Sequence, residues 1–523
     1  MAGSIAAFNL LTEPLIRIRR RGSEECVTLP GLFAAFMSDD VESVLALRPH
    51  QKQALHAFLA QVGAMALLSA DETEPPVFVE AWAALLRGLT PDFAHDEPWC
   101  LVVDDLSKPA FLQPPVPEGR LGVLKELEFT PDALDMLVTS KNHDLKAARI
   151  TSAEPDLWLL ALLTLQTCEG FLGRGNYGIS RMNGGFASRP FVGIAPKGRW
   201  GAHIKRDIER LIELRSEIVA TYPMYREDGG LGLVWLRPWD GDAQLTPDEL
   251  DPYYVEICRR VRLSFDGTAI VAHRGASNKP RIAMPGGLNG NTGDPWTPID
   301  RNENKALTVD GSGFHYRRVA ELLDASRFTP SPLQELRTGD GCEGLELALS
   351  VIVRGQGETQ GYHERRIPIP PRAVPFFMRR GATDRLGALA RERVANAATM
   401  RREVLSPALF SLFQNGPDKI NYKHPATQTK VEPFLSRFDR EVDSDFFEHL
   451  FDELSEDSDP PAARRLRRAW LMQLKERAGD VLATAEAGSP LSHVRRYRAR
   501  AAAKSVLDSA FRNAFDSWLR EDR

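Results

Sequence analysis

The sequence predicts an α+β protein in which a large mixed N-terminal globular domain, residues 1–378, is followed by a C-terminal four-helix bundle, residues 379–523. Up to about residue 375, short strand-like runs and amphipathic helical segments alternate with many Pro and Gly residues. Beyond that point the strand signals fade and helical periodicity takes over. A chain of 523 residues with 43% apolar content is also long enough to fill more than one core.

The first elements of the mixed domain are two short strands and two helices. IRIRR and CVTLP, within residues 16–30, have the composition of strands, and residues 50–70 place apolar side chains at helical spacing. Residues 152–170 carry Pro155 where a helix would start and Gly170 where it would stop. A glycine-rich segment is therefore expected to leave the C-terminus of a buried helix.

Two hairpins are expected further along the chain. Residues 261–273 form strand-like runs that turn at Asp266-Gly267. Residues 345–370 are typical of two strands joined by a Gly-rich tip. Between them, residues 286–300 are rich in turn formers and show no periodicity, which indicates a long loop.

The C-terminal region contains helical periodicity in four stretches separated by turn-forming segments. These stretches lie near residues 382–414, 432–454, 461–485 and 490–520. Four helices with short connections favour a bundle.

Charge and cysteine usage exclude some classes of protein. The formal net charge is −5, so the chain lacks the overall basic excess of a free-standing DNA-binding protein. Charge is nevertheless uneven, since residues 437–459 are acidic and 464–500 are basic.

Five widely spaced cysteines give neither a metal motif nor a disulfide framework, so buried thiols are expected. With no secretory signal and no apolar run long enough for a membrane, a cytoplasmic protein is expected.

The segment 168–190 holds six glycines between Gly170 and Gly185, with Arg174, Arg181 and Arg189 among them. Its GRGNYG matches the dinucleotide fingerprint G-x-G-x-x-G, but a helix and not a strand precedes it, which argues against a Rossmann fold. Glycines let a backbone approach another surface closely, and the arginines would supply countercharge to phosphates. A purely structural Ω-loop explains the same composition, and both interpretations stay open.

Motifs for catalysis are weak throughout the chain. Asp104 and Asp105 are the only strand-end carboxylate pair that resembles a metal site, and such pairs are more often solvated turns. His143 and Asp144 lie in a basic, irregular segment, which suggests a binding loop and not an acid–base pair. A metal-dependent nuclease or a nucleotide-using enzyme, built on the two aspartates or on the G-x-G-x-x-G match, remains the alternative function.

Several motifs, in order, resemble those of one known family. The chain opens with FNLLTEPLIRIRR and continues with LRPHQKQALHAFLAQV, KPAFLQP, SKNHD, a GF-x-G loop, MNGGFASRP, DPWTP and ERR. This order is similar to that of the CasA family, the large subunit of the type I-E CRISPR surveillance complex Cascade. The resemblance spans the whole chain, including the terminal helical region.

The resemblance implies recognition without catalysis, cofactor or metal. Sister subunits would read the target through guide RNA, while this subunit would check the protospacer-adjacent motif in the flanking double-stranded DNA, largely from the minor groove. It would also start strand separation and help to recruit the helicase-nuclease. The implied partners are target DNA, guide RNA, the other Cascade subunits including the small subunits, and the helicase-nuclease, with no membrane.

The resemblance also assigns roles to particular residues. The glycine loop laid against the DNA groove would be Gly170, Phe171, Leu172, Gly173, Arg174 and Gly175. The wedge beneath the first base pair would be Gln360 with Thr359 beside it, or Gln356. Other DNA contacts would come from Lys279 or Arg281 and, if they do not simply form a solvated helix face, from Arg464, Arg465, Arg467 and Arg468. The loop that meets guide RNA and neighbouring subunits would be Ser140, Lys141, Asn142, His143 and Asp144.

Overall fold

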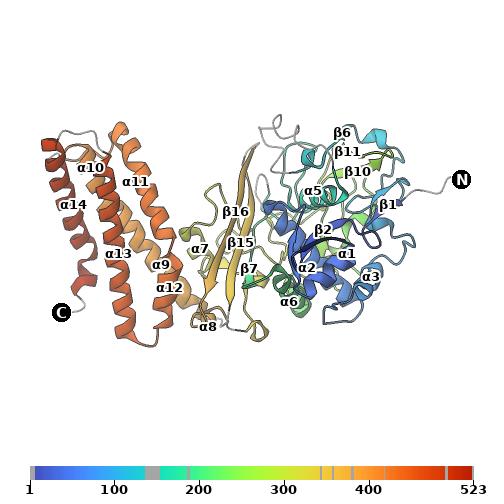
Figure 1. Ribbon diagram of the computed structural model, residues 1–523, viewed down its shortest axis with the longest axis horizontal. Coiled ribbons are helices and arrows are strands. Elements are labelled where there is room, and N and C mark those ends of the chain that lie inside the picture. Colours follow the sequence, from blue (N-terminus) through green and yellow to red (C-terminus); the bar gives the residue numbers. More distant parts are fainter. Residues whose placement is uncertain are drawn as a thin grey trace. The chain divides into compact units, whose positions relative to one another are not determined.

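The computed structural model describes residues 6–135, 153–184, 189–341, 344–355, 358–378, 382–416, 419–488 and 493–520. The chain divides into two compact units (Figure 1), the first formed by Met1–Gly313 with Thr329–Pro368 and the second by Phe314–Phe328 with Ile369–Arg523. The boundary predicted after residue 378 differs from this division. The helical unit also takes in a segment from the middle of the chain, which no local sequence pattern indicates.

The first unit contains short sheets and five described helices. The helices are α1 (Leu29–Met37), α2 (Lys52–Ser69), α3 (Val79–Gly88), α5 (Pro155–Cys168) and α6 (Trp200–Thr221). The strands are β1 (Ala6–Asn9), β2 (Ile16–Arg20), β3 (Ser23–Val27), β4 (Val41–Val44), β5 (Cys100–Val103), β6 (Glu126–Glu128), β7 (Phe191–Pro196), β8 (Leu231–Leu233), β9 (Leu250–Val255), β10 (Arg260–Phe265), β11 (Ile270–Gly275), β12 (Ile299–Asp300), β13 (Lys305–Ala306), β14 (Phe328–Thr329), β15 (Leu345–Gly355) and β16 (Glu358–Ile369). Their described sheet orders are β3-β2-β4, β1-β5, β10-β11-β6, β8-β9, β13-β12-β14 and β16-β15-β7.

Helix α2 forms the centre of this unit, with almost every residue buried. It packs against α5 and α6, and Gly63 permits the close approach to α6. A Cβ atom at Gly63 would lie 2.8 Å from Cδ1 of Ile208. The predicted helix at residues 50–70 and the predicted helix before Gly170 are both confirmed, the latter as α5. The thiols of Cys100, Cys168 and Cys258 are buried as expected, whereas that of Cys26 is exposed.

Both predicted hairpins are present. Strands β10 and β11 pair antiparallel from Arg260↔Gly275 to Phe265↔Ile270 around the Asp266-Gly267 turn. Strand β15 pairs antiparallel with β7, with Leu347 opposite Ile194, and β16 lies on its other side. The apolar side chains of β15 are buried, so the long hairpin is anchored in the first unit.

The second unit consists mostly of long helical runs (Figure 1). Its helices are α7 (Tyr316–Leu322), α8 (Val374–Met378), α9 (Ala382–Thr399), α10 (Ser406–Phe413), α11 (Pro425–Asp443), α12 (Phe446–Ser455), α13 (Pro460–Ala487) and α14 (His493–Arg520). A π-helical turn at Met400–Leu405 joins α9 to α10, so the first predicted stretch is one run.

The second predicted stretch, 432–454, needs correction at its start and in its middle. Helix α11 begins at Pro425, where proline suits a first helical position, and it contains Pro433 in its interior. The run is then interrupted at Ser444 and Asp445 before α12 begins. In the described part of the chain, every helix is too short or too polar to cross a bilayer.

Candidate nucleic-acid interface

The glycine loop leaves α5 through a buried base. Gly170 is buried, and its carbonyl oxygen accepts a hydrogen bond from Nη2 of Arg259 at 2.7 Å. The same guanidinium also donates to the carbonyl oxygen of Tyr177, on the returning leg of the loop. A Cβ at Gly178 would lie 2.7 Å from the carbonyl carbon of Gly170, so only glycine lets the two legs pack this closely. Arg259 therefore clamps both legs together.

The tip of the loop is a tight turn with open space beside its central glycine, Gly173. The amide of Leu172 donates to the carbonyl of Asn176 at 2.9 Å, and the amide of Asn176 donates to that of Gly173 at 3.0 Å. Gly173 has φ +115°, a conformation that favours glycine, and nothing lies within 4 Å of the position its Cβ would take. Leu172 is 42% exposed and Arg174 is exposed. The tip therefore presents main chain, one leucine and one arginine.

Gly175 closes the turn against a second segment. It is buried with φ +93°, and its carbonyl accepts from the amide of Ser277 at 3.0 Å. Lys279, two residues beyond Ser277, is exposed. Arg281 is 2% exposed and donates to the carbonyls of Ala243 and Arg237, so its guanidinium is held inside the fold, which does not fit the DNA contact expected of it. Of the two alternatives, only Lys279 presents its charge to solvent.

Two of the three arginines interleaved with the glycines are structural, which corrects the expectation that all three supply countercharge. Arg181 is 1% exposed and lies over the ring of Tyr254 at 3.8 Å. Arg189 forms a buried ion pair with Asp294, Nε to Oδ2 at 2.6 Å. Asp294 belongs to the DPWTP motif, so this pair joins two of the motifs that were quoted from the sequence. Arg174 alone remains at the surface.

The second feature is the β15–β16 hairpin. Gln360 is the third residue of β16 and is exposed. Its Oε1 lies 3.0 Å from the position that a Cβ would take at Gly311, so a bare backbone lies beside the amide. Gly361 follows with φ +117°. Gln356 lies outside the described residues, and so does the side chain of Thr359.

A buried ion pair connects the hairpin to the glycine loop. Arg354, one residue before the end of β15, pairs through Nη2 with Oε1 of Glu169, and their side chains are 7% and 3% exposed. Glu169 immediately precedes Gly170. The hairpin end and the loop base are thus held together within the first unit, although 185 residues separate the two partners.

Sequence reasoning missed the residues that hold this arrangement together. Arg259 donates a hydrogen bond to the carbonyl of Gly170, 89 residues away in the sequence. Glu169 is a single acidic residue at the end of an apolar helix. Neither carries a local signal, since each acquires its partner only through the tertiary fold. The residues Ser140, Lys141, Asn142, His143 and Asp144 lie outside the described part of the chain.

The arginine cluster belongs to α13 of the second unit. Arg464, Arg465 and Arg468 are exposed. Arg467 differs, because its Nη2 binds Oε1 of the buried Glu453 at 2.7 Å and its guanidinium lies over the ring of Trp518. It is therefore a structural residue of the bundle, and the prediction that it contacts DNA does not fit this geometry.

Asp105 and the G-x-G-x-x-G match, two of the features that suggested an enzyme, have structural explanations. One carboxylate oxygen of Asp105, Oδ1, accepts hydrogen bonds from the amide and the hydroxyl of Ser107, at 3.0 and 2.6 Å. Asp105 therefore stabilises the turn that follows β5. The G-x-G-x-x-G match follows helix α5, so it does not place a helix N-terminus at a pyrophosphate.

One group in the described chain has the ligand types of a metal site: His56, His203 and Asp207. The Nε1 of Trp200 lies 2.9 Å from Nδ1 of His56, and an indole N–H only donates. The proton of His56 is therefore on Nε2, which donates to Oδ2 of Asp207 at 2.8 Å. A metal on Nε2 would require both nitrogens of the His56 ring to be deprotonated. The group is therefore part of a hydrogen-bonded network in the core, from Trp200 through His56 to Asp207.

Fold and site define a two-unit α+β protein that presents a clamped glycine turn and a long β-hairpin on its mixed unit and exposed arginines on its helical unit. The chain belongs to the CRISPR-associated Cse1 family, whose model matches residues 9–481. A search of curated proteins finds no significant match.

Several solved structures have the same fold. Cse1 from Acidimicrobium ferrooxidans is similar at TM-score 0.64 and 14% identity, covering 98% of this chain and 99% of its own. CasA from Thermus thermophilus is similar at TM-score 0.63 and 14% identity, over 96% and 99%. Cse1 from Thermobifida fusca gives 0.61 and 14%, over 98% and 99%. At this identity the likeness concerns the fold.

Proposed function

We propose that this chain is the non-catalytic large subunit of a type I-E CRISPR RNA-guided DNA surveillance complex, Cascade, and that it recognises the protospacer-adjacent motif in double-stranded DNA. Membership of the Cse1 family supports the first part. One observation supports the second most strongly: the turn at Gly173 has open space where a side chain would lie, and its base is clamped by Arg259.

A turn of this kind suits the minor groove. The groove is only about 6 Å wide, so a backbone that lacks a Cβ atom at Gly173 would reach base edges that a backbone with a bulky side chain at that position could not. Its amides and carbonyls meet the acceptors of A·T pairs and the amino group of guanine. Because A·T and T·A look nearly alike in this groove, the subunit should tolerate several related motifs. Arg174 and Lys279 would bind flanking phosphates.

Strand separation is assigned to the hairpin. Gln360, with Thr359 beside it, would enter beneath the first base pair, and Gln356 is the competing choice at the tip. Unstacking costs a few kcal/mol per step. Guide pairing and contacts to the displaced strand would offset that cost. The buried pair between Arg354 and Glu169 joins strand β15 to the loop base and would help to hold the proposed wedge near the loop.

The remaining surfaces would serve assembly. Arg464, Arg465 and Arg468 are candidates for holding the displaced single strand. The loop of Ser140 to Asp144 would meet the guide RNA and neighbouring subunits. The bundle would pack against the small subunits, and the acidic and polar faces would recruit the helicase-nuclease. Other subunits would supply the basic channel, which fits the negative charge of this chain.

A binding screen of the assembled complex over randomised flanking duplex tests this function. The proposal expects a short set of related motifs to be enriched, with no cleavage by the isolated chain in Mg²⁺ or Mn²⁺. Enrichment of no motif would contradict recognition. Turnover that is lost on Asp104→Ala would show the nuclease alternative to be correct.

A further inference from the structure

A four-residue turn, Asp310 to Gly313, lies against β16, the strand that carries Gln360. The amide of Gly313 donates to the carbonyl of Asp310 at 2.9 Å. Oδ1 of Asp310 accepts from the amide of Ser312 at 2.9 Å and from its hydroxyl at 2.5 Å. These hydrogen bonds close the turn and fix its backbone. The turn and β16 up to Pro368 belong to the same unit.

Both glycines of this turn face β16. A Cβ atom at Gly311 would lie 3.0 Å from Oε1 of Gln360 and 3.5 Å from its Cβ. A Cβ atom at Gly313 would lie 2.5 Å from Nδ1 of His363 and 3.1 Å from its Cβ. The side chains of Gln360 and His363 therefore both start toward the turn, and both lie on backbone that has no side chain of its own.

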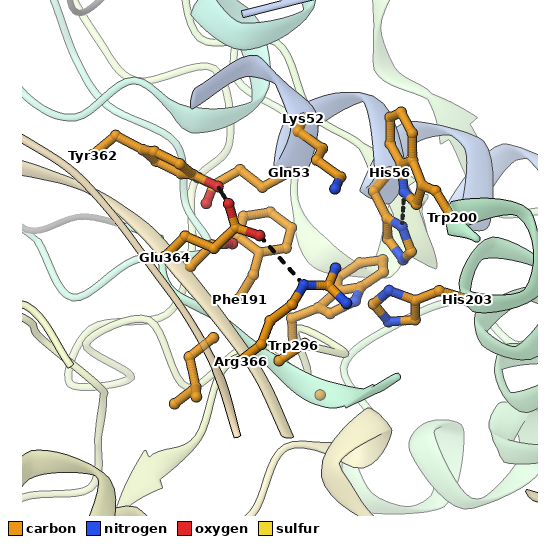
Figure 2. Close-up of a pocket in the computed structure, with 14 residues that line it drawn as sticks. Lys52, Gln53, His56, Phe191, Trp200, His203, Trp296, Tyr362, Glu364 and Arg366 are labelled. Carbon is orange, nitrogen blue, oxygen red and sulfur yellow. Dashed lines mark hydrogen bonds and ion pairs between the residues drawn. The ribbon is translucent and has the colours of Figure 1, made fainter. Parts of the chain in front are cut away.

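A regular strand would not bring these two side chains to one turn. Figure 2 shows Tyr362, Glu364 and Arg366 of β16 lining the same pocket, with the Tyr362 hydroxyl 3.2 Å from Oε2 of Glu364. Side chains alternate between the two faces of a strand. With regular geometry, Gln360 would lie on the face of Tyr362, and His363 on the opposite face.

Gly361 accounts for the irregularity. It lies between Gln360 and Tyr362 and has φ +117°, a conformation that favours glycine and that a regular strand does not use. A glycine of this kind within a strand is typical of a bulge, which changes the direction of a neighbouring side chain. Gly361 therefore turns Gln360 out of the row of Tyr362 and toward the turn.

The position of β16 explains why such a contact would matter. In the described sheet order β16-β15-β7, β16 is an edge strand and pairs on one side only. A wedge must part stacked base pairs, which resist unstacking. A long side chain that is free to rotate loses conformational entropy when it is fixed in one position. Contact with a closed turn would reduce this cost, while Gln360 stays exposed to a duplex.

We propose that the turn Asp310–Gly313 braces the wedge. Gly311 and Gly313 are positioning residues that hold Gln360 and β16 in place against the resistance of the stacked base pairs, and Gly361 directs Gln360 onto them. This inference rests on the proposed role of Gln360 in strand separation.

Gly311→Leu tests the brace in the assembled complex. Gly311 is exposed and does not have a positive φ, so a side chain there displaces Gln360 without straining the backbone. Opening of a matched target, followed with 2-aminopurine at the first target position, should slow about tenfold, because misplacing a positioned group is costly. Gly311→Ala should have a smaller effect. A target whose first base pairs are mismatched should open at the parental rate, and motif-dependent duplex binding should not change.

Gly88→Leu is the matched control, since Gly88 at the end of α3 is also exposed, has open space around it and has no positive φ. It should open the target at the parental rate. Thermal midpoints of both leucine variants should equal that of the parent.

A double variant separates failure of the brace from failure of the wedge. If Gly311→Leu acts through Gln360, it should slow opening no further once Gln360→Ala is present. Parental opening by Gln360→Ala alone would contradict the wedge, and the brace with it. Slow opening by Gln360→Ala, combined with parental opening by Gly311→Leu, would overturn the brace and leave the wedge intact. An additional loss in the double variant would also overturn the brace, because the leucine would then act on its own.

Discussion

Arg354 and Glu169 form an ion pair that is almost fully buried, with 7% and 3% of their side chains exposed. The pair joins the end of strand β15 to the residue before the glycine loop. Loop and hairpin are therefore parts of one rigid arrangement, and a change at this pair should affect recognition and strand opening together.

Arg354→Ala leaves the Glu169 carboxylate buried without its partner. We expect the free energy of unfolding of the subunit to fall by about 3–5 kcal/mol. Arg402→Ala is the control, because its pair with Glu403 is exposed on both sides and should contribute less than about 1 kcal/mol. Urea unfolding of both variants measures the difference, and equal losses would show that the buried pair is not important for stability.

Gly173→Ala should impair motif recognition by placing a side chain at the apex of the turn. Gly267→Ala is the matched control, since Gly267 also has a positive φ and open space around it but lies in the β10–β11 turn. Both changes should cost about 1–3 kcal/mol of backbone strain. Only Gly173→Ala should weaken motif-dependent duplex binding, by about tenfold or more. Identical affinities for the two variants would remove the loop from the interface.

Gln360→Ala should slow opening of the target duplex more than it impairs assembly of the guide complex. Its side chain is exposed, so the fold should be unaffected. The yield of R-loop, followed with 2-aminopurine at the first target position, should recover on a target whose first base pairs are already mismatched. Gln428→Ala, an exposed glutamine of α11, serves as control. A yield equal to that of the parent on the matched target would exclude the wedge role.

Arg464→Ala with Arg465→Ala should reduce the salt dependence of single-strand capture. Each lost phosphate contact lowers the slope of log K against log salt by about 0.7, so the double variant should lose about 1.4. Arg467→Ala should instead destabilise the bundle, because Arg467 pairs with the buried Glu453. An unchanged slope in the double variant would assign these arginines to a solvated face.

Stability should depend on pH through Glu256, next to the segment that follows the glycine loop. Burial raises the pKa of Glu256 from 4.5 to about 7, although the amide and hydroxyl of Ser180 donate to its carboxylate. The folded state therefore binds the proton more tightly than the unfolded state does. The free energy of unfolding should fall as pH rises from 4.5 to about 7. Glu256→Gln should remove this fall in urea unfolding at pH 5 and pH 8; an unchanged fall would assign it to other groups.

The sequence predicted elements that depend on local patterns. The helix before Gly170 and the turn at Asp266-Gly267 could be identified because caps, periodicity and turn formers are properties of neighbouring residues. The start of α11 was missed, since the helix begins at Pro425 and continues through Pro433 in its interior.

The candidate site was less predictable, because an arginine in a sequence does not reveal what it contacts. The residues around Arg181, Arg189 and Arg281 did not distinguish them from Arg174. Tertiary partners nevertheless bury the side chains of these three arginines, whereas that of Arg174 is exposed. Asp294, the partner of Arg189, lies 105 residues away. The glycines were the better guide, since the close approach of Gly178 to Gly170 has a local geometric cause.

The central claim is that the glycine turn recognises the flanking duplex through its minor groove, and base analogues test it most directly. Inosine for guanine, or 2,6-diaminopurine for adenine, removes or adds the minor-groove amino group, whereas 7-deazapurines alter only the major groove. With the preferred motif in the assembled complex, the account predicts that the minor-groove analogues change the affinity and the 7-deazapurines leave it unchanged. Sensitivity to the 7-deazapurines alone would contradict the account.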